Sequence, residues 1–234
     1  MMKMTIYMKI KHHSIFNDLK TDNIDWERLR ENPNEISYYI PTSKSEYISI
    51  LEKYSVNQNT ILELKQIINQ NNIKNILSLG CGRAYLEYYL NKIIKVKIDI
   101  SDLTESIKKI KSFNIFNNAY LLDFSKKFNL EKNEYQLVLL SRIDTELTDN
   151  QLEDLFESLF NSNIKCIYFI PAELLTFKTL LVEIKLFIKS LLYRKKRVFC
   201  GYARTEKSLI SKWKGFYNFK KDSQNNYLLY NDII

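Results

Sequence analysis

Short runs of apolar residues alternate along the middle of the chain with segments of helical spacing. Runs typical of buried strands occupy residues 75–79, 93–100, 119–122, 135–141 and 164–170. Between them, apolar residues at intervals of three and four predict helices at 83–91, 103–113 and 150–160. Strands that alternate with helices form βαβ units, so the pattern predicts a mostly parallel sheet with helices on both faces.

The end of the chain departs from this alternation. A helix at 205–213 precedes two strand patterns, at 216–221 and 227–230, which only residues 222–226 separate. A helical crossover needs more residues than this, so the last two strands must pair antiparallel. The predicted fold is therefore α/β, with a mostly parallel seven-stranded sheet and a C-terminal antiparallel hairpin.

The first part of the chain shows a weaker pattern. Residues 1–43 form an irregular or partly helical lead-in, and helices are expected at 43–54 and 60–69. The expected division is a lead-in and helical N-terminal cover at residues 1–59, followed by an α/β domain at 60–234.

One long helix, expected at 172–192, has a wide apolar face. Its apolar residues are Leu174, Leu175, Phe177, Leu180, Leu181, Ile184, Phe187, Ile188 and Leu191, and the basic run Arg194-Lys195-Lys196-Arg197 follows. This pattern favours a buried helix that covers the sheet and ends in a solvated basic cluster. The alternative is contact with an anionic membrane surface, which amphipathic helices with basic clusters also make.

The composition narrows the classes of partner and compartment. A formal charge of +8 attracts anions, so phosphorylated substrates, nucleic acid and anionic membranes are all compatible. Cys81, Cys166 and Cys200 form no paired-cysteine motif, which indicates neither zinc nor a disulfide framework. No signal-peptide core or membrane span is expected, so a cytoplasmic protein is predicted, with contact to the inner membrane face as the alternative.

The most informative segment is Gly80-Cys81-Gly82-Arg83-Ala84, which directly follows the first strand and precedes a helix. Glycines at such a turn let a ligand lie against the backbone, and the helix that follows presents free N–H groups. Asp99 is expected at the C-terminal end of the next strand, where a carboxylate can accept hydrogen bonds from both hydroxyls of a ribose. The alternative is a helix-capping aspartate, a task for which Ser101 or Asp102 is better placed.

These segments resemble the class I S-adenosylmethionine-dependent methyltransferases over residues 60–232. The likeness lies in LSLGCGRAYLEYYL, KIDIS and AYLLDFS, and in the C-terminal hairpin, which separates that family from the nicotinamide dehydrogenases. The resemblance implies a Rossmann-like fold with S-adenosylmethionine as cofactor, and it puts Asp123 and Phe124 at the adenine. The residues implied to bind the cofactor are Ser78, Gly80, Cys81, Gly82, Asp99, Ile100, Asp123, Phe124 and Ser141.

The chain departs from the family pattern at two positions. Ser78 stands where the family usually has an acid that orients the methionine part of the cofactor, and Ala84 replaces the third glycine. Ser78 retains a hydrogen-bonding group but carries no charge. Glu87 or a residue of the N-terminal segment is the candidate to compensate. Without compensation, the chain would be a non-catalytic binding protein with a degenerate cofactor site.

The loop after the fourth strand, residues 141–147, is the main candidate for the acceptor side. It leaves the sheet at the edge where open α/β folds bind ligands. Asp144 or Glu146 is the candidate general base, and Arg142 is the candidate group to hold an anionic acceptor. The alternative is a capping and salt-bridging loop that leads into the next helix.

Two other regions are candidates for contact with the acceptor. Tyr39 precedes the core, where related enzymes often have a helical cover, and Arg204 is suited to a phosphate or carboxylate. Packing for the tyrosine and surface solvation for the arginine are equal alternatives. His12 and His13, the only histidines, lie in the lead-in, either exposed or as part of a lid over the site.

The function predicted is methyl transfer from S-adenosylmethionine to a small-molecule or glycan acceptor, at oxygen. An RNA methyltransferase is an alternative that the positive charge favours. Against it, the sequence shows no RNA-binding motif and no Asn/Asp-Pro-Pro-Tyr tetrapeptide of the amino-methylating nucleic-acid enzymes. A non-catalytic binding protein is the third reading. The acceptor, the methylated atom and the oligomeric state do not follow from the sequence.

Overall fold

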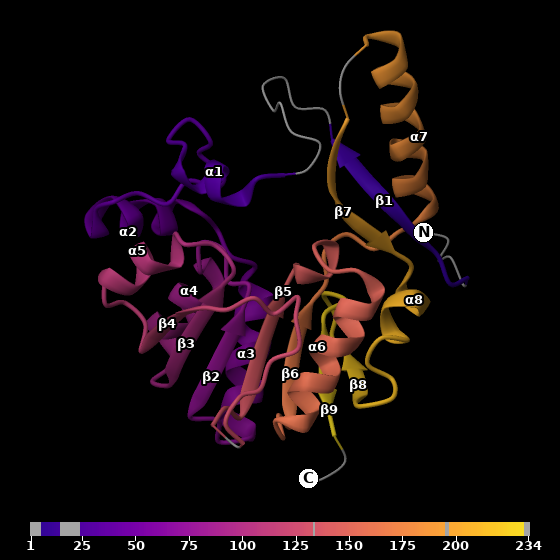
Figure 1. Ribbon diagram of the computed structural model, residues 1–234. Helices are drawn as coiled ribbons and strands as arrows, with labels where there is room; N and C mark the ends of the chain where they lie inside the picture. Colours follow the sequence, from indigo (N-terminus) through magenta and orange to yellow (C-terminus); the bar gives the residue numbers. More distant parts are fainter. Residues whose placement is uncertain (1–5, 15–23, 133, 195–196, 232–234) are drawn as a thin grey trace.

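Seven strands form one sheet in the computed structural model, which describes residues 6–14, 24–132, 134–194 and 197–231. They are β2 (Asn75–Leu79), β3 (Lys97–Asp102), β4 (Asn118–Leu121), β5 (Leu137–Ser141), β6 (Cys166–Ile170), β8 (Asn218–Lys221) and β9 (Tyr227–Tyr230). The order is β4-β3-β2-β5-β6-β9-β8 (Figure 1). The first five strands are parallel, and β9 pairs antiparallel with β6 and β8. The predicted sheet and its C-terminal hairpin are confirmed.

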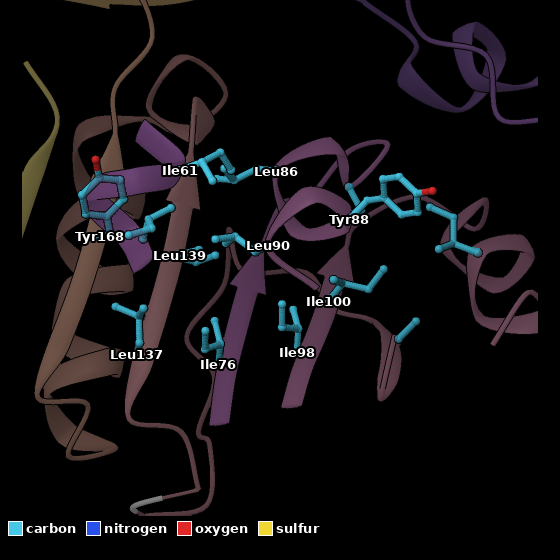
Figure 2. Close-up of a cluster of buried hydrophobic side chains, with 14 of the residues drawn as sticks. Ile61, Ile76, Leu86, Tyr88, Leu90, Ile98, Ile100, Leu137, Leu139 and Tyr168 are labelled. Carbon is cyan, nitrogen blue, oxygen red and sulfur yellow. The ribbon is translucent and has the colours of Figure 1, made fainter. Parts of the chain in front are cut away.

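A buried apolar cluster lies on one face of the sheet, against α3 (Gln58–Gln70) and α4 (Tyr85–Ile93). Figure 2 shows Ile76, Ile98 and Leu137 on the strands, close to Leu90 of α4. Successive strand residues point to opposite faces, so every second residue of β2, β3 and β5 enters this cluster.

The alternate strand residues form a second cluster on the other face. Leu77, Val138 and Leu140 pack there against α6 (Asp149–Asn161) and α8 (Glu206–Ile210). Trp213 is fully buried in this cluster, with its ring centroid 5.5 Å from that of Phe156. α5 (Ile107–Ser112) connects β3 to β4. Burial on both faces explains why β5 reads as an unbroken apolar run.

Two helices before α3 form the N-terminal cover. α1 (Trp26–Glu31) lies over the edge where the parallel strands end (Figure 1), and α2 (Lys44–Lys53) follows it in the chain. Ser43 caps α2, because its hydroxyl accepts a hydrogen bond from the Glu46 N–H at 3.3 Å. Tyr47 is buried and its hydroxyl donates to the Arg83 carbonyl at 2.7 Å, which ties α2 to the glycine-containing turn.

Two strands form a second, two-stranded antiparallel sheet that the pattern of apolar residues does not predict. They are β1 (Lys9–Ser14), expected as irregular lead-in, and β7 (Val198–Arg204). We call this pair the ribbon. Each strand is short and has its partner near the other end of the chain, so neither shows a local hairpin pattern. His12 and His13 lie in β1.

α7 (Phe177–Leu192) packs on the ribbon and projects away from the seven-stranded sheet (Figure 1). The expectation of a buried, sheet-covering helix at 172–192 is therefore wrong. Thr176 starts the helix by accepting a hydrogen bond from the Thr179 N–H, and only Glu183 and Ser190 of the helix are buried. Two residues of the basic run, Lys195 and Lys196, lie outside the described residues.

Candidate functional site

The candidate site lies at the point in the sheet where the order of the strands reverses. β3 and β5 flank β2, and the loops after these strands leave at the same edge of the sheet (Figure 1). Open α/β sheets bind ligands at such a switch point, outside the carboxyl ends of the strands. The segments that meet here are the turn after β2, the end of β3, the loop after β5 and α1.

The turn after β2 requires glycine at its first position. Gly80 has φ +68°, and a Cβ there would lie 2.6 Å from Ile143 Cγ2 and 3.0 Å from Phe124 Cζ. A side chain would therefore clash with the loop after β5 and with the aromatic ring. Cys81 N–H donates to the Ser101 carbonyl at 3.0 Å, which fastens the turn to β3. The turn then enters α4 at Ala84.

Asp102 is the acid at the end of β3. Its Oδ2 accepts a hydrogen bond from the Gly82 N–H at 2.9 Å, and its Oδ1 accepts from the Thr104 N–H at 3.1 Å. Arg30 of α1 donates to both carboxylate oxygens, at 2.5 and 3.1 Å. Asp102 is buried, so its charge depends on this pairing. The arginine was not among the candidates, because no local pattern links residues 72 positions apart.

Asp99 does not end the strand, which corrects the position expected for it. It lies three residues before the end of β3, opposite Leu77 of β2. Its carboxylate accepts hydrogen bonds from Asn117 Nδ2 at 2.6 Å, Tyr135 Oη at 2.8 Å and Tyr120 Oη at 3.2 Å. Burial, together with the bond to this carboxylate, raises the pKa of Tyr135. Asp99 therefore joins β3 to the start of β4, to β4 itself and to the segment that precedes β5.

Ser78 and Glu87 form a buried polar pair beneath the turn. The Ser78 hydroxyl donates to Glu87 Oε1 at 2.5 Å, and both residues are almost fully buried. Burial raises the pKa of the Glu87 carboxyl to about 7. The carboxyl that sequence reasoning named as a substitute for the missing acid thus contacts the side chain at that position.

The residues expected near an adenine differ in their surroundings. Phe124 is buried against Gly80 and Ile143. Asp123 is partly exposed, and its ion pair with Lys126 at 2.8 Å holds its pKa below the usual range. Ile100 is fully buried in the core cluster on the α4 side, so its side chain does not face the ligand edge.

The loop after β5 brings three predicted residues to the same edge. Ser141 ends β5, and Arg142 follows with φ +59° and an exposed side chain. Asp144 lies in the short helix η1 (Ile143–Thr145), where burial raises its pKa and its Oδ1 accepts from the Ala172 N–H at 2.9 Å. Glu146 accepts a hydrogen bond from Trp26 Nε1 of α1 at 2.9 Å. Asp144 thus ties two loops together, whereas Glu146 faces the cover.

Arg204 is buried and hydrogen-bonded to other groups of the chain, which corrects its assignment to the acceptor pocket. Its side chain is fully buried, and Nε donates to Asp149 Oδ1 at 2.9 Å. The remaining guanidinium nitrogens donate to the carbonyls of Asp144 and Leu147. With these donors engaged, Arg204 fastens the loop after β5 to β7. Tyr39 is half-buried in the connection between α1 and α2.

α1 spans the edge of the sheet and contacts both sides of the site. On the β3 side, Arg30 pairs with Asp102, and the Glu27 carboxylate accepts a hydrogen bond from the Glu105 N–H at 2.8 Å. On the β5 side, Trp26 donates a hydrogen bond to Glu146. Across the residues that the structure describes, no group of three or more His, Cys, Asp or Glu side chains is arranged to hold a metal ion. Nor is any helix in those ranges both long and apolar enough to cross a membrane.

The fold is similar to solved methyltransferase structures, although no family model matches the sequence and no curated protein matches it significantly. Human N-acetylserotonin methyltransferase in complex with SAM is 18% identical over 90% of this chain, with a TM-score of 0.55. The chain spans 63% of that protein. Magnesium protoporphyrin IX methyltransferase from Synechocystis PCC 6803 with bound SAH is 12% identical, with a TM-score of 0.54. The match covers 87% of this chain and 90% of that protein.

A third similar structure matches almost end to end. The PH0226 protein from Pyrococcus horikoshii OT3 is 17% identical over 88% of this chain and 98% of its own, with a TM-score of 0.54. At these identities the likeness establishes the fold, and the residues of the site must be judged from their own geometry.

Proposed function

Because the chain has the fold of the class I S-adenosylmethionine-dependent methyltransferases, we propose that it binds this cofactor at the carboxyl edge of its sheet. We further propose that it transfers the methyl group to an oxygen of a small-molecule or glycan acceptor. The observation that supports this most is Asp102, a buried carboxylate at the end of β3 whose Oδ2 lies 2.9 Å from the Gly82 nitrogen. An acid in this position can accept a hydrogen bond from a ribose hydroxyl.

Asp102 takes the ribose role that sequence reasoning gave to Asp99. The Asp99 carboxylate accepts hydrogen bonds from four side chains inside the sheet region, whereas Asp102 adjoins the turn. The turn itself leaves room for a ligand, because a Cβ on Gly82 would meet nothing closer than Arg30 Nη2 at 3.9 Å. These features fit a nucleoside that lies against the backbone after β2.

In this proposal, Glu87 binds the methionine part of the cofactor. The Ser78 hydroxyl lacks charge, but it is hydrogen-bonded to the Glu87 carboxyl, whose pKa of about 7 leaves a large ionised fraction near neutral pH. A carboxylate next to the turn favours the positively charged amino group of the cofactor. The departure at Ser78 is therefore compatible with a functional site.

Arg30 must leave Asp102 for a ribose to bind. Two nitrogens of Arg30, the Gly82 N–H, and the N–H and hydroxyl of Thr104 make five hydrogen bonds to the Asp102 carboxylate. A carboxylate offers about four lone-pair positions, so no acceptor capacity is left for ribose hydroxyls. Cofactor binding therefore requires the Arg30 side chain to move away from Asp102.

Glu146 is the general base in this proposal, and Asp144 positions its loop. The bound cofactor supplies an electrophilic methyl group, so the protein must align an acceptor and remove its proton. Glu146 lies beneath α1 at the exposed end of the loop. Asp144 is buried and accepts a hydrogen bond from the Ala172 N–H. The exposed Arg142 beside them suits an anionic group on the acceptor.

Calorimetric titration of the full chain with S-adenosylmethionine, S-adenosylhomocysteine and NAD⁺ tests the cofactor proposal. We expect saturable binding of the first two ligands and none of the dinucleotide. A ligand that binds only the folded state also raises the melting temperature, which gives a second readout. Absence of binding at millimolar S-adenosylhomocysteine overturns the proposal.

Release of S-adenosylhomocysteine in a screen of sugars, glycans and phenols then tests the transfer. With any acceptor found, Glu146→Gln should lower kcat and leave the affinity for S-adenosylhomocysteine unchanged. Glu153→Gln, at an exposed acid on α6 that pairs with Lys212, is the matched control. Equal kcat in the two variants removes Glu146 from the role of base.

A further inference from the structure

α7 carries its apolar face outward. The helix packs on the ribbon, and its buried residues are Glu183 and Ser190. Nine large apolar residues between Phe177 and Tyr193 are strongly exposed, almost half of the nineteen such residues in the described part of the chain. They are Phe177, Leu181, Val182, Ile184, Phe187, Ile188, Leu191, Leu192 and Tyr193. Such a concentration on one surface element marks an interaction site.

The exposed residues form a continuous stripe. Phe177, Leu181, Ile184, Ile188 and Leu191 follow one another at intervals of four and three, which places them on one side of the helix. Their exposed fractions run from 48% at Ile184 to 63% at Leu191. The ribbon covers the opposite side (Figure 1). We call this stripe the outer face of α7.

The charges around the outer face have one sign. Lys178, Lys185 and Lys189 are exposed and share one flank of the helix, since they are separated by seven and four residues. Arg194, also exposed, follows the helix. Over residues 177–194 the only acid is Glu183, and it is buried and engaged.

Glu183 binds the ribbon and contributes nothing to the outer face. Its Oε1 lies 2.5 Å from His12 Nδ1 and accepts from the His13 N–H at 3.3 Å. Its Oε2 lies 3.4 Å from Arg197 Nη2. These contacts fix which side of α7 faces the ribbon, and they leave an apolar stripe bordered by lysines on the opposite side.

We propose that the outer face of α7 docks on an anionic lipid surface. An apolar face with lysines along its border is the pattern of helices that lie in the membrane interface, with the apolar side chains at the acyl boundary and the lysines at the phosphates. The helix is 16 residues long. At 1.5 Å per residue it spans about 24 Å, less than the hydrocarbon core of about 30 Å, so it lies in the plane of the surface.

Charge complementarity favours lipid over a second copy of the chain. A second α7 would bring its own lysines against the first set, and the helix offers no exposed carboxylate to pair with them. Like charges in such an arrangement oppose association, whereas an anionic headgroup layer attracts each lysine. The inference does not depend on the proposed methyl transfer.

Co-sedimentation of the full chain with vesicles tests the proposal. We expect binding to phosphatidylcholine vesicles that contain phosphatidylglycerol, little binding to phosphatidylcholine alone, and weaker binding at high salt. The double variant Leu181→Glu/Ile188→Glu should lower partitioning at least about tenfold. Lys185→Glu/Lys189→Glu should lower it on anionic vesicles. Each altered residue is exposed, so the melting temperatures should stay close to that of the wild type.

The matched control is Ile36→Glu/Leu62→Glu, which changes two exposed apolar residues outside α7 and should leave binding unchanged. Failure of the wild type to bind anionic vesicles overturns the proposal, as does equal binding by Leu181→Glu/Ile188→Glu. A concentration-dependent dimer in light scattering that this variant abolishes, without vesicle binding, assigns the outer face to a second copy instead.

Discussion

The sheet edge and α7 use apolar residues in opposite ways. At the edge, Phe124 and Ile143 pack inward around Gly80, and the charged groups are buried in pairs such as Arg30 with Asp102. On α7 the buried pair is Glu183 with the ribbon, while the apolar side chains face outward. The two regions differ in what covers their apolar side chains.

This difference shows what an amphipathic pattern establishes. The spacing of apolar residues in α7 gives the width and direction of a face, but not the surface that the face meets. In the sheet, the neighbours of each strand are supplied by the same chain. On α7 the ribbon takes the polar side, because Glu183 finds two histidines and an arginine there.

The largest contrast should appear when the same side chain is shortened in each region. Leu140 is fully buried in β5, and Leu191 is 63% exposed on α7. Leu140→Ala should lower the free energy of unfolding by about 2–5 kcal/mol through lost burial and a residual cavity. Leu191→Ala should change it by less than about 0.5 kcal/mol. Urea unfolding of both variants measures this, and comparable losses would mean that the outer face of α7 is buried.

The buried acid of the site should make stability depend on pH. Glu87 keeps its proton up to about pH 7 when folded and loses it near 4.5 when unfolded. Between these values the folded state binds more protons at Glu87, so the stability that this residue contributes is fully present below pH 4.5 and is lost as the pH rises towards 7. The shift corresponds to about 3 kcal/mol at most.

Urea midpoints of the wild type and of Glu87→Gln between pH 5 and 8 measure this contribution. The amide cannot titrate, so the variant should lose the fall in stability with rising pH. Glu153→Gln, at an exposed acid, should keep it. An unchanged pH profile in Glu87→Gln contradicts the assignment.

The two regions are joined at Gly201 of β7. Its φ is +123°, and a Cβ there would lie 2.4 Å from the Thr145 carbonyl oxygen in η1. Gly201→Ala should therefore lower the free energy of unfolding by about 2 kcal/mol or more. Gly215→Ala, where a Cβ would meet nothing within 4 Å, is the control. If both substitutions have equal effects on thermal unfolding, the ribbon does not press on the site loop.

Arg30 should oppose cofactor binding from within the site. Arg30→Ala removes two of the five hydrogen bonds on Asp102 and frees acceptor capacity for a ribose. We expect about tenfold tighter binding of S-adenosylhomocysteine in calorimetry, since a buried charge then gains a partner. Arg28→Ala, at an exposed arginine on the same helix, should have no effect. Weaker binding by Arg30→Ala would make this arginine a ligand of the cofactor.

The sequence predicted most of the sheet and the turn, because their signals are local. Apolar runs mark β5 and β6, and Gly80 directly follows a strand. The predicted end of β3 was wrong, because Ser101 and Asp102 are polar and do not continue the apolar pattern of the strand. They extend β3 by pairing with Tyr120 and Leu121 of β4. The strand therefore ends at Asp102 instead of near Asp99.

Contacts between distant segments account for the other errors. The ribbon joins β1 to β7, and Arg30 reaches Asp102 across 72 positions. Arg204 pairs with Asp149 and two carbonyls through tertiary packing. The sequence does not reveal this pairing, so the arginine was a candidate to bind an acceptor. Local patterns predict an element and its faces, but the partner of each face is set by the whole fold.

The most direct test of the proposed site compares Asp102→Asn with Asp99→Asn in calorimetric titrations with S-adenosylhomocysteine. One charge-assisted hydrogen bond to a ribose hydroxyl is lost in the first variant, so its affinity should fall about tenfold or more. Asp99→Asn should lower thermal stability and keep the affinity within about threefold. Lost affinity in Asp99→Asn with retained affinity in Asp102→Asn, both variants being folded, would contradict the assignment of the ribose to Asp102.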